Sequence, residues 1–445
     1  MKRLALYCVN VKDGLNVIEM AQEEPRNTLK RSLSLLDATA ISVGAIIGGG
    51  IFVVTGIVAG LAGSALVVSM VVAAVIAFFT ALSFAELAAW QPVEGSVYEY
   101  ARQVISPFSG FLAGWMWMVS NIFTGAAVSL GFAYYLTATF PDLPANAVAA
   151  VMCIAFTALN YLGARESARL NTVLVAAKLL ILGFFVVFGV FNADTANFAP
   201  FQPFNEGVLY GAYFIFFAYT GFARAAVVAE EVKDAKRNVP KAMLLSLAIS
   251  TVVYVLVGIV AVGLVGANTL ADSNSPLAAA ISVTGNTLAV QVVSFGGLLA
   301  TASVLLTAIL GVSRMAYSMA RRKDLPQALA KLNPKFCTPQ YSIWAVGILM
   351  AVLVLFFDLT GVVAISTFGA LFYYALTNAS ALRLKTEKRR YHKLVPIVGL
   401  GTCVVLLVFI LFVATQAWII GGISLIIGAV YYGAKKHVSK RSPEK

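Results

Sequence analysis

The chain has 445 residues, of which 60% are hydrophobic and only 12% are charged. Soluble globular domains carry about 25% charged residues, so this composition excludes a string of ordinary soluble domains and predicts one large membrane bundle. The formal net charge of +12 would suit a nucleic-acid-binding protein, but the distribution of the basic residues argues against that class.

Apolar runs of about 20 residues, each long enough to cross the hydrocarbon layer as a helix, follow one another along the chain. We predict an all-α membrane protein with twelve transmembrane helices. The stretch 270–286, which contains Pro276, is expected to form an external loop with a short helix. The predicted spans cover residues 35–60, 64–90, 105–138, 146–163, 168–191, 208–231, 242–266, 287–320, 340–357, 361–382, 394–413 and 415–433.

The basic residues predict the orientation, because Lys and Arg accumulate in cytoplasmic loops. When the N-terminal tail, residues 1–32, is placed in the cytoplasm, all 32 Lys and Arg residues fall in cytoplasmic segments or within spans. The C-terminal tail, residues 434–445, is then cytoplasmic too. We therefore expect a multi-pass protein of the plasma membrane whose basic loops contact anionic lipid head groups rather than nucleic acid.

The sequence predicts no cofactor and no metal site. Its four cysteines are scattered without a Cys-x-x-Cys pair, and both histidines lie in basic loop or tail segments. A membrane enzyme would need a nucleophile–base pair or metal ligands at membrane depth, so we expect the chain not to be an enzyme. A sensor or accessory subunit is disfavoured because no soluble output domain is present.

Glycines interrupt two of the predicted spans. Span 1 carries the run Gly48–Gly50, and each glycine costs a helix about 1 kcal/mol relative to alanine. Backbone groups freed at membrane depth must line a cavity or be buried in protein, so the run predicts a broken helix. Span 6 carries Gly221 between aromatic residues, where a break and close helix packing are equally good interpretations.

Two broken helices that face each other at mid-membrane form a site that offers free amide donors on one side and free carbonyl acceptors on the other. The amide groups that begin the second half of span 1 suit a carboxylate, and the carbonyl groups freed before each break suit an ammonium group. An α-amino acid carries both. Asn121 in span 3 either faces this site or contacts another helix. The candidate substrate-binding residues are Ile46, Gly48, Gly49, Gly50, Asn121, Phe217, Ala218, Tyr219 and Gly221.

Isolated charges in the spans are further candidates. Lys178 lies about 12 Å inside the predicted cytoplasmic end of span 5. Because desolvation favours its neutral form, it either exchanges protons or snorkels to the head groups. Arg224 either pairs with a carboxylate as a cytoplasmic gate, which we favour, or biases the site toward acidic substrates. The possible gate residues are Arg224, Glu86, Glu230 and Glu231, although the three acidic residues are otherwise ordinary solvated helix-end charges.

Several segments together resemble the amino acid–polyamine–organocation superfamily, most of all its cationic-amino-acid-transporter-type and broad-specificity proton-coupled branches. The resemblance implies a leucine-transporter-like fold of two inverted five-helix repeats, over residues 33–192 and 205–384, with two further helices over 393–433. It also implies that the glycine run contacts the substrate carboxylate and that the carbonyl side surrounds the amino group. The segments that carry it are Gly44–Phe52, Pro92–Tyr100, Phe217–Glu231, Lys233–Pro240 and Ala316–Pro326.

The same resemblance implies how transport is driven. In similar proton-coupled members a lysine placed like Lys178 substitutes for the sodium ion of other relatives, and Ser303 on span 8 would be its partner. Relatives that carry cationic substrates often have an acidic residue where this chain has Ala223. We therefore expect the substrates of this chain to be amino acids with neutral side chains, and the specificity to be either narrow or broad. The expected function is amino acid import by proton symport with alternating access. Exchange of amino acids or organic cations is an alternative, and sodium coupling is a less favoured one.

Overall fold

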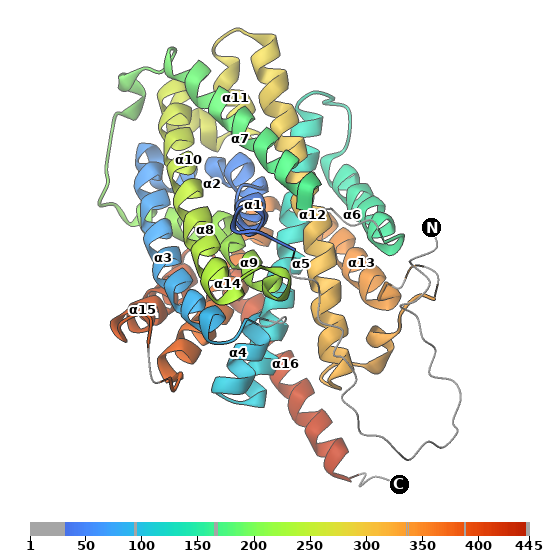
Figure 1. Ribbon diagram of the computed structural model, residues 1–445. Helices are drawn as coiled ribbons and strands as arrows, with labels where there is room; N and C mark the ends of the chain where they lie inside the picture. The colour runs from blue at the N-terminus through green and yellow to red at the C-terminus, as the bar shows by residue number, and fades with distance from the viewer. Residues whose placement is uncertain are drawn as a thin grey trace.

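The computed structural model describes residues 32–92, 96–163, 168–334, 336, 338–386 and 389–441. Over these ranges the regular secondary structure is helical, apart from one isolated parallel bridge between Leu33 and Val232. The helices gather in one bundle, with α1 (Leu35–Ile46) near its centre and α15 (Leu394–Phe409) and α16 (Thr415–Arg441) at its periphery (Figure 1). The bundle has the all-helical architecture that the apolar runs predict.

The length and apolarity of the helices support a multi-pass membrane protein. Within the described ranges, eight helical stretches are long and apolar enough to cross a membrane. The first of them, Leu35–Trp90, contains three consecutive helices, and two further apolar helices, Ala145–Tyr161 and Gln340–Phe356, are shorter. The count of twelve spans therefore stays a prediction.

The first half of the chain begins with a capped helix. The Ser34 hydroxyl accepts a hydrogen bond from the Asp37 amide, and the Asp37 carboxylate accepts one from the Ser34 amide. This capping box satisfies amides that would otherwise lack partners at the start of the helix. The helical elements of this half are α1 (Leu35–Ile46), η1 (Gly50–Val54), α2 (Thr55–Ala62), η2 (Gly63–Ala65), α3 (Leu66–Trp90), α4 (Ser96–Val104), α5 (Pro107–Thr137), α6 (Ala145–Tyr161), α7 (Ala168–Val190) and η3 (Thr195–Phe198).

The helix of span 7 is kinked at its predicted end. Span 7 was expected over 242–266, and α10 leaves the helical conformation at Gly266, whose φ of 73° only glycine adopts easily, before a last helical segment reaches Ala271. The short helix α11 lies in the expected external loop. The elements of this half are α8 (Glu206–Tyr219), η4 (Thr220–Ala223), α9 (Arg224–Val227), η5 (Ala229–Glu231), α10 (Ala235–Ala271), α11 (Pro276–Ser282), α12 (Thr287–Arg321), η6 (Gln327–Ala330), α13 (Gln340–Phe356), α14 (Leu359–Arg383), α15 (Leu394–Phe409), η7 (Ile410–Phe412) and α16 (Thr415–Arg441).

Burial separates the inner helices from the outer ones. From Gly211 to Tyr219, every residue of α8 is buried, so this helix is apolar all round because protein surrounds it. On the outer helices α7, α15 and α16, large apolar side chains such as Leu180, Val405 and Ile426 are more than half exposed. A continuous apolar exterior of this kind suits a lipid environment rather than water.

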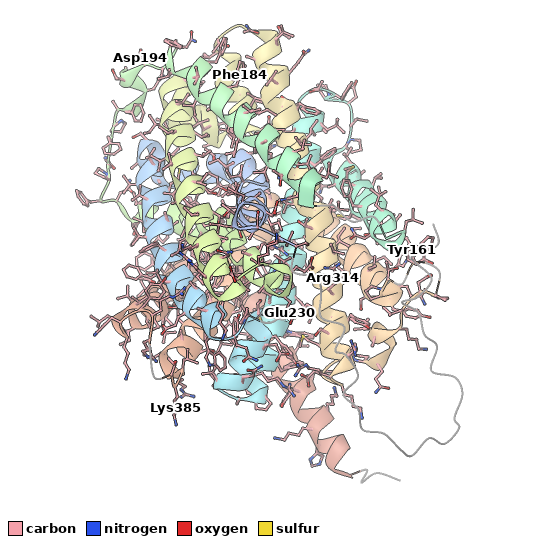
Figure 2. All side chains as sticks on the ribbon, viewed as in Figure 1. Tyr161, Phe184, Asp194, Glu230, Arg314 and Lys385 are labelled. Atoms are coloured by element: carbon pink, nitrogen blue, oxygen red, sulfur yellow. The ribbon has the colours of Figure 1, made fainter. Side chains whose placement is uncertain are left out.

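Two charged residues from loops that are predicted to lie on opposite sides of the membrane can be located in the bundle. Asp194 belongs to a predicted external loop and Lys385 to a predicted cytoplasmic loop, and the two residues lie at opposite ends of the bundle (Figure 2). The helix α4, which the sequence did not predict, forms within the predicted cytoplasmic segment 91–104 because it buries Tyr98 and Tyr100 against the bundle.

Candidate functional site

The helix of span 1 is interrupted at its glycine run. The Ile47 amide makes the last regular hydrogen bond of α1, to the Val43 carbonyl at 2.7 Å, and the Ile47 backbone then leaves the helical region with a ψ of 74°. Regular winding resumes at Gly50 in the π-helical turn η1. Residues Ile46–Val54 are all buried, so the interruption lies inside the bundle.

The helix of span 6 changes its winding instead of opening. After Tyr219 the chain forms the 3₁₀ turn η4, then the single α-helical turn α9, then the second 3₁₀ turn η5. A 3₁₀ turn leaves some carbonyl groups without their α-helical partners. The expected interruption near Gly221 is therefore present in a tighter form than an unwound segment.

Glycines allow the two interruptions to touch. A β-carbon on Gly221 would collide with the backbone of Ala45 and Ile46, and one on Gly50 would lie 2.5 Å from the Ala218 Cβ. Glycine is the residue that permits such close approach of two backbones. The interrupted segments of spans 1 and 6 are therefore packed directly against each other.

Tyrosine hydroxyl groups donate hydrogen bonds to backbone carbonyl oxygens at the two interruptions. Tyr254 of α10 donates to the Ile46 carbonyl at 2.6 Å and lies 3.2 Å from the Ala218 carbonyl, while Tyr374 of α14 donates to the Thr220 carbonyl at 2.7 Å. Neither tyrosine was predicted from the sequence. A tyrosine inside an apolar span needs a partner for its hydroxyl, and this is the signal that would have pointed to them.

Ser42 ties α1 to the same region. Its hydroxyl donates to the Phe222 carbonyl at 3.2 Å and accepts from the Ala225 amide at 3.0 Å. Nearer the predicted cytoplasmic end, the Leu33 amide donates to the Glu231 carbonyl at 3.0 Å in the isolated bridge. Spans 1 and 6 are thus joined by hydrogen bonds at several positions along their length, so the two segments are mechanically coupled.

Lys178 lies in the bundle interior, with 1% of its side chain exposed. Its Nζ donates to the Ser303 hydroxyl of α12 at 2.5 Å and to the Gly44 carbonyl of α1 at 3.2 Å. The side chain therefore connects α7 with α1 and α12. The snorkelling interpretation is wrong for this structure, because the ammonium group points into the bundle rather than toward its end.

A small cavity adjoins the interruption of span 6. Its volume is about 40 Å³, enough for a few water molecules. Ala45, Thr220 and Gly221 line it from the interrupted spans, and residues of α4, α5, α12 and α14 close the other sides. Of the predicted substrate-binding residues, Asn121 and Gly221 line this cavity. The others, Ile46, Gly48, Gly49, Gly50, Phe217, Ala218 and Tyr219, pack around the junction of the two interruptions instead.

Arg224 also lines this cavity, and this corrects the pairing that we favoured from the sequence. Its Nη2 donates to the Asn121 Oδ1 at 3.1 Å, and its guanidinium carbon lies 5.8 Å from the centre of the Trp117 ring. Among the described residues, the ion pairs that form join Arg102 to Asp324 and Arg322 to Glu99, and no carboxylate pairs with Arg224. The Arg224 side chain therefore points to the cavity and is held there by uncharged groups.

The three predicted gate carboxylates are separated from Arg224. Glu86 is buried near the end of α3, where neither of its oxygens has a hydrogen-bond partner among the described residues. Glu230 is exposed and Glu231 is partly buried in η5. The structure therefore does not bring the four predicted gate residues together.

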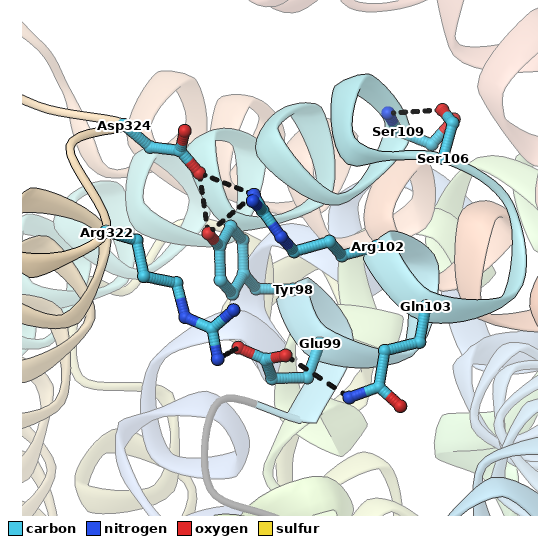
Figure 3. Close-up of polar contacts among 8 residues, drawn as sticks. All are labelled: Tyr98, Glu99, Arg102, Gln103, Ser106, Ser109, Arg322 and Asp324. Carbon is cyan, nitrogen blue, oxygen red and sulfur yellow. Dashed lines mark hydrogen bonds and ion pairs between the residues drawn. The ribbon is translucent and has the colours of Figure 1, made fainter. Parts of the chain in front are cut away.

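A different set of charged residues forms a cluster between α4 and the end of α12. Figure 3 shows Tyr98 of α4 donating to the Asp324 carboxylate, which also accepts from Arg102. Glu99 accepts from Arg322, which follows α12, at 2.7 Å. Burial, together with the Asp324 carboxylate, raises the pKa of Tyr98 above its ordinary value, so its hydroxyl stays a donor at physiological pH.

This cluster links the loop between spans 2 and 3 to the end of span 8. Ser96, the first residue of α4, lines the cavity itself. Within the described residues, no group of three His, Cys, Asp or Glu side chains is arranged to hold a metal ion. The chemistry of the site consists of hydrogen bonds, one buried lysine and one cavity-facing arginine.

A bundle with an apolar exterior and two interrupted helices meeting at its centre defines a multi-pass membrane transporter. The chain belongs to the amino acid permease family, which matches residues 33–433. This confirms the resemblance to the amino acid–polyamine–organocation superfamily.

Several curated proteins are similar over nearly the whole chain. An uncharacterized transporter of Mycobacterium tuberculosis is 39% identical over 417 residues, 93% of each chain. The methylthioribose transporter of Bacillus subtilis is 30% identical over 441 residues, which cover 93% of this chain and 95% of the relative. The branched-chain amino acid permease of the same organism is 30% identical over 390 residues, 83% and 84% of the two chains. These relatives are transporters, which points to transport rather than to an enzymatic reaction.

Proposed function

We propose that this chain is a secondary active transporter that imports amino acids by proton symport with alternating access. Membership of the amino acid permease family supports the substrate class. The observation that carries the coupling mechanism is the position of Lys178, whose Nζ lies between the Gly44 carbonyl and the Ser303 hydroxyl.

The proposed coupling follows from what a proton does to that amine. A protonated Lys178 carries a full charge, and its hydrogen bond to the Gly44 carbonyl is then about twice as strong as a neutral one. Release of the proton removes the charge and weakens the link between α7 and α1. Because α1 leads directly into the interruption of span 1, proton binding and release would favour different positions of the substrate site.

The substrate site in this proposal is the junction of the two interruptions. The amide groups at Gly48, Gly49 and Gly50 would bind the carboxylate of the amino acid. The carbonyl side, formed by Ile46 and Phe217–Tyr219, would receive the ammonium group. The Ile46 carbonyl already accepts from the Gly48 amide at 2.8 Å and from Tyr254 at 2.6 Å, so a substrate ammonium group would replace one of these two donors and, where it replaces the first, release the Gly48 amide for the carboxylate.

The proposal includes the architecture that the sequence predicts. Twelve spans form two inverted repeats, 33–192 and 205–384, followed by a pair of helices over 393–433, with both tails in the cytoplasm. Most of the N-terminal tail, residues 1–32, lies outside the described residues. Each interruption then falls in the first helix of its repeat, and this correspondence supports the repeat assignment.

The proposed substrates are amino acids without a positively charged side chain, neutral ones among them and over a broad range. The absence of a carboxylate at Ala223 supports this, and so does the neighbouring positive charge of Arg224 on the cavity wall. A cationic side chain placed beside Arg224 would be repelled in an environment that screens charges weakly.

Uptake into proteoliposomes tests the coupling. Radiolabelled amino acids should accumulate when the outside is acidic and sodium is absent. Lys178→Ala should abolish this accumulation, yet it should retain counterflow exchange without a pH gradient if the substrate site is intact. Lys241→Ala, which removes an exposed lysine from α10, is the matched control and should behave like the wild type.

Three results would contradict the proposal. Uptake that requires sodium and survives Lys178→Ala would exclude proton coupling through this residue. Counterflow in the wild type without any pH-driven accumulation would identify an exchanger. A purified wild-type protein that neither binds nor transports any amino acid would exclude the substrate class.

A further inference from the structure

The cavity beside Gly221 contains a positive charge that has no anionic partner among the residues that the structure describes. Arg224 is the charged residue among those that line it, and no described lining residue is acidic. Both of its observed partners, the Asn121 amide and the Trp117 ring, are uncharged. A buried charge without a counter-charge is costly, and such residues in membrane proteins commonly lie on substrate or ion pathways.

The guanidinium group is held in place and still has donors to offer. The Asn121 Nδ2 donates to the Trp117 carbonyl at 2.9 Å, and this bond turns the Asn121 Oδ1 toward Arg224. Of the five N–H donors of the guanidinium, the hydrogen bonds found in the described residues use one. Arg224 is only partly buried and lines the cavity, so its remaining donors can reach a molecule bound there.

The described residues that line the cavity around Arg224 carry hydroxyl groups, and none of them carries a carboxylate. Tyr373 and Tyr374 of α14 line the same cavity as Arg224. The Tyr374 hydroxyl is engaged with the Thr220 carbonyl at 2.7 Å. The donor for a bound carboxylate is therefore the planar guanidinium, which binds carboxylates through charged, bidentate hydrogen bonds.

We propose that this cavity is the side-chain subsite of the transporter and that it prefers a carboxylate, so that aspartate and glutamate are favoured substrates. This inference rests on the proposed amino acid transport. The α-amino and α-carboxylate groups would bind at the junction of the interruptions, and the side chain would extend past Gly221 to Arg224. The cavity volume of about 40 Å³ favours a short acidic side chain over a bulky one.

Charge matching explains why the acidic side chain is preferred. A bound carboxylate supplies the counter-charge that Arg224 lacks among the described residues. A neutral amide of the same shape leaves the arginine unpaired, and a cationic side chain is repelled. The preference therefore depends on the charge of the substrate side chain and only weakly on its shape.

The first experiment compares isosteric substrates with the wild-type protein at pH 7. Glutamate and aspartate should compete for uptake, and should raise the thermal midpoint of the purified protein, at concentrations about tenfold or more below those of glutamine and asparagine. Glutamine binding as tightly as glutamate, or more tightly, would overturn the inference even if no variant folds.

The second experiment assigns the preference to Arg224. Arg224→Gln should bring the glutamate-to-glutamine ratio close to one, mainly by weakening glutamate. Arg321→Gln removes an exposed arginine of α12 and should leave the ratio unchanged. If Arg224→Gln weakens both substrates equally, the guanidinium serves the α-carboxylate and the side-chain assignment is wrong.

The failure of this inference and the failure of the proposed function give different results. Uptake of neutral amino acids with no response to glutamate or aspartate would overturn the acidic preference and leave amino acid transport intact. A wild-type protein that neither binds nor transports any of the four amino acids would overturn both.

Discussion

At the scale of single residues, Tyr254 has the most unusual position in the bundle. One hydroxyl group lies within hydrogen-bonding distance of carbonyl oxygens in both interrupted spans, Ile46 and Ala218. Buried carbonyl groups that lose their partners cost about 1–3 kcal/mol in place of the modest net gain of a formed hydrogen bond. Tyr254 therefore stabilises the junction and keeps the two segments at a fixed separation.

We predict that Tyr254→Phe lowers the thermal midpoint of the purified protein and raises KM for amino acid uptake, because the junction loses its shared donor. A thermal-shift assay and initial uptake rates measure the two effects. Tyr341→Phe removes a hydroxyl from a half-exposed tyrosine of α13 and should change neither quantity. Equal behaviour of the two variants would show that the hydroxyl of Tyr254 contributes nothing to the junction.

At the scale of helices, spans 1 and 6 act as a pair because a glycine lets their backbones touch. A methyl group on Gly221 would overlap the backbone of Ala45 and Ile46, which cannot move away as a flexible side chain would. Overpacking of this kind costs about 1–3 kcal/mol, and here it also separates the two interruptions. The junction therefore tolerates no side chain at this position.

We predict that Gly221→Ala destabilises the protein and strongly reduces transport, although alanine is the better helix former. Gly183→Ala is the matched control, because a β-carbon at this position of α7 meets open space. It should leave transport unchanged and slightly raise the thermal midpoint. Normal transport by Gly221→Ala would contradict the close contact of the two backbones at this site.

The helix α4 shows a limit of sequence reasoning at the same scale. Segment 91–104 is short and polar, so hydropathy alone assigns it to a loop. Its helix forms because Tyr98 and Tyr100 find buried positions, and because Arg102 finds the Asp324 carboxylate 222 residues further along the chain. Partners at such distances are created by the fold and cannot be read from local sequence pattern.

At the scale of the whole molecule, the membrane class, the interruptions and the family followed from the sequence. Apolar runs and glycine runs are local signals with a direct physical cost in lipid, so they point to spans and breaks without further information. The contact of Lys178 with Ser303 came from the family resemblance. The tyrosine donors were missed, and the cavity-facing position of Arg224 was the less favoured of two interpretations, because both depend on which helices lie side by side.

The orientation of the whole molecule gives the last prediction. Asp194 and Lys385 are separated by five predicted spans, so they should lie on opposite sides of the membrane, as they lie at opposite ends of the bundle (Figure 2). In a background with all four cysteines replaced by serine, a cysteine at position 194 should react with an impermeant maleimide applied outside intact cells. A cysteine at position 385 should react only after the membrane is opened, because basic residues keep this loop inside. Reaction of both positions from the same side would mean an even number of crossings between them, and it would exclude the pair of five-helix repeats.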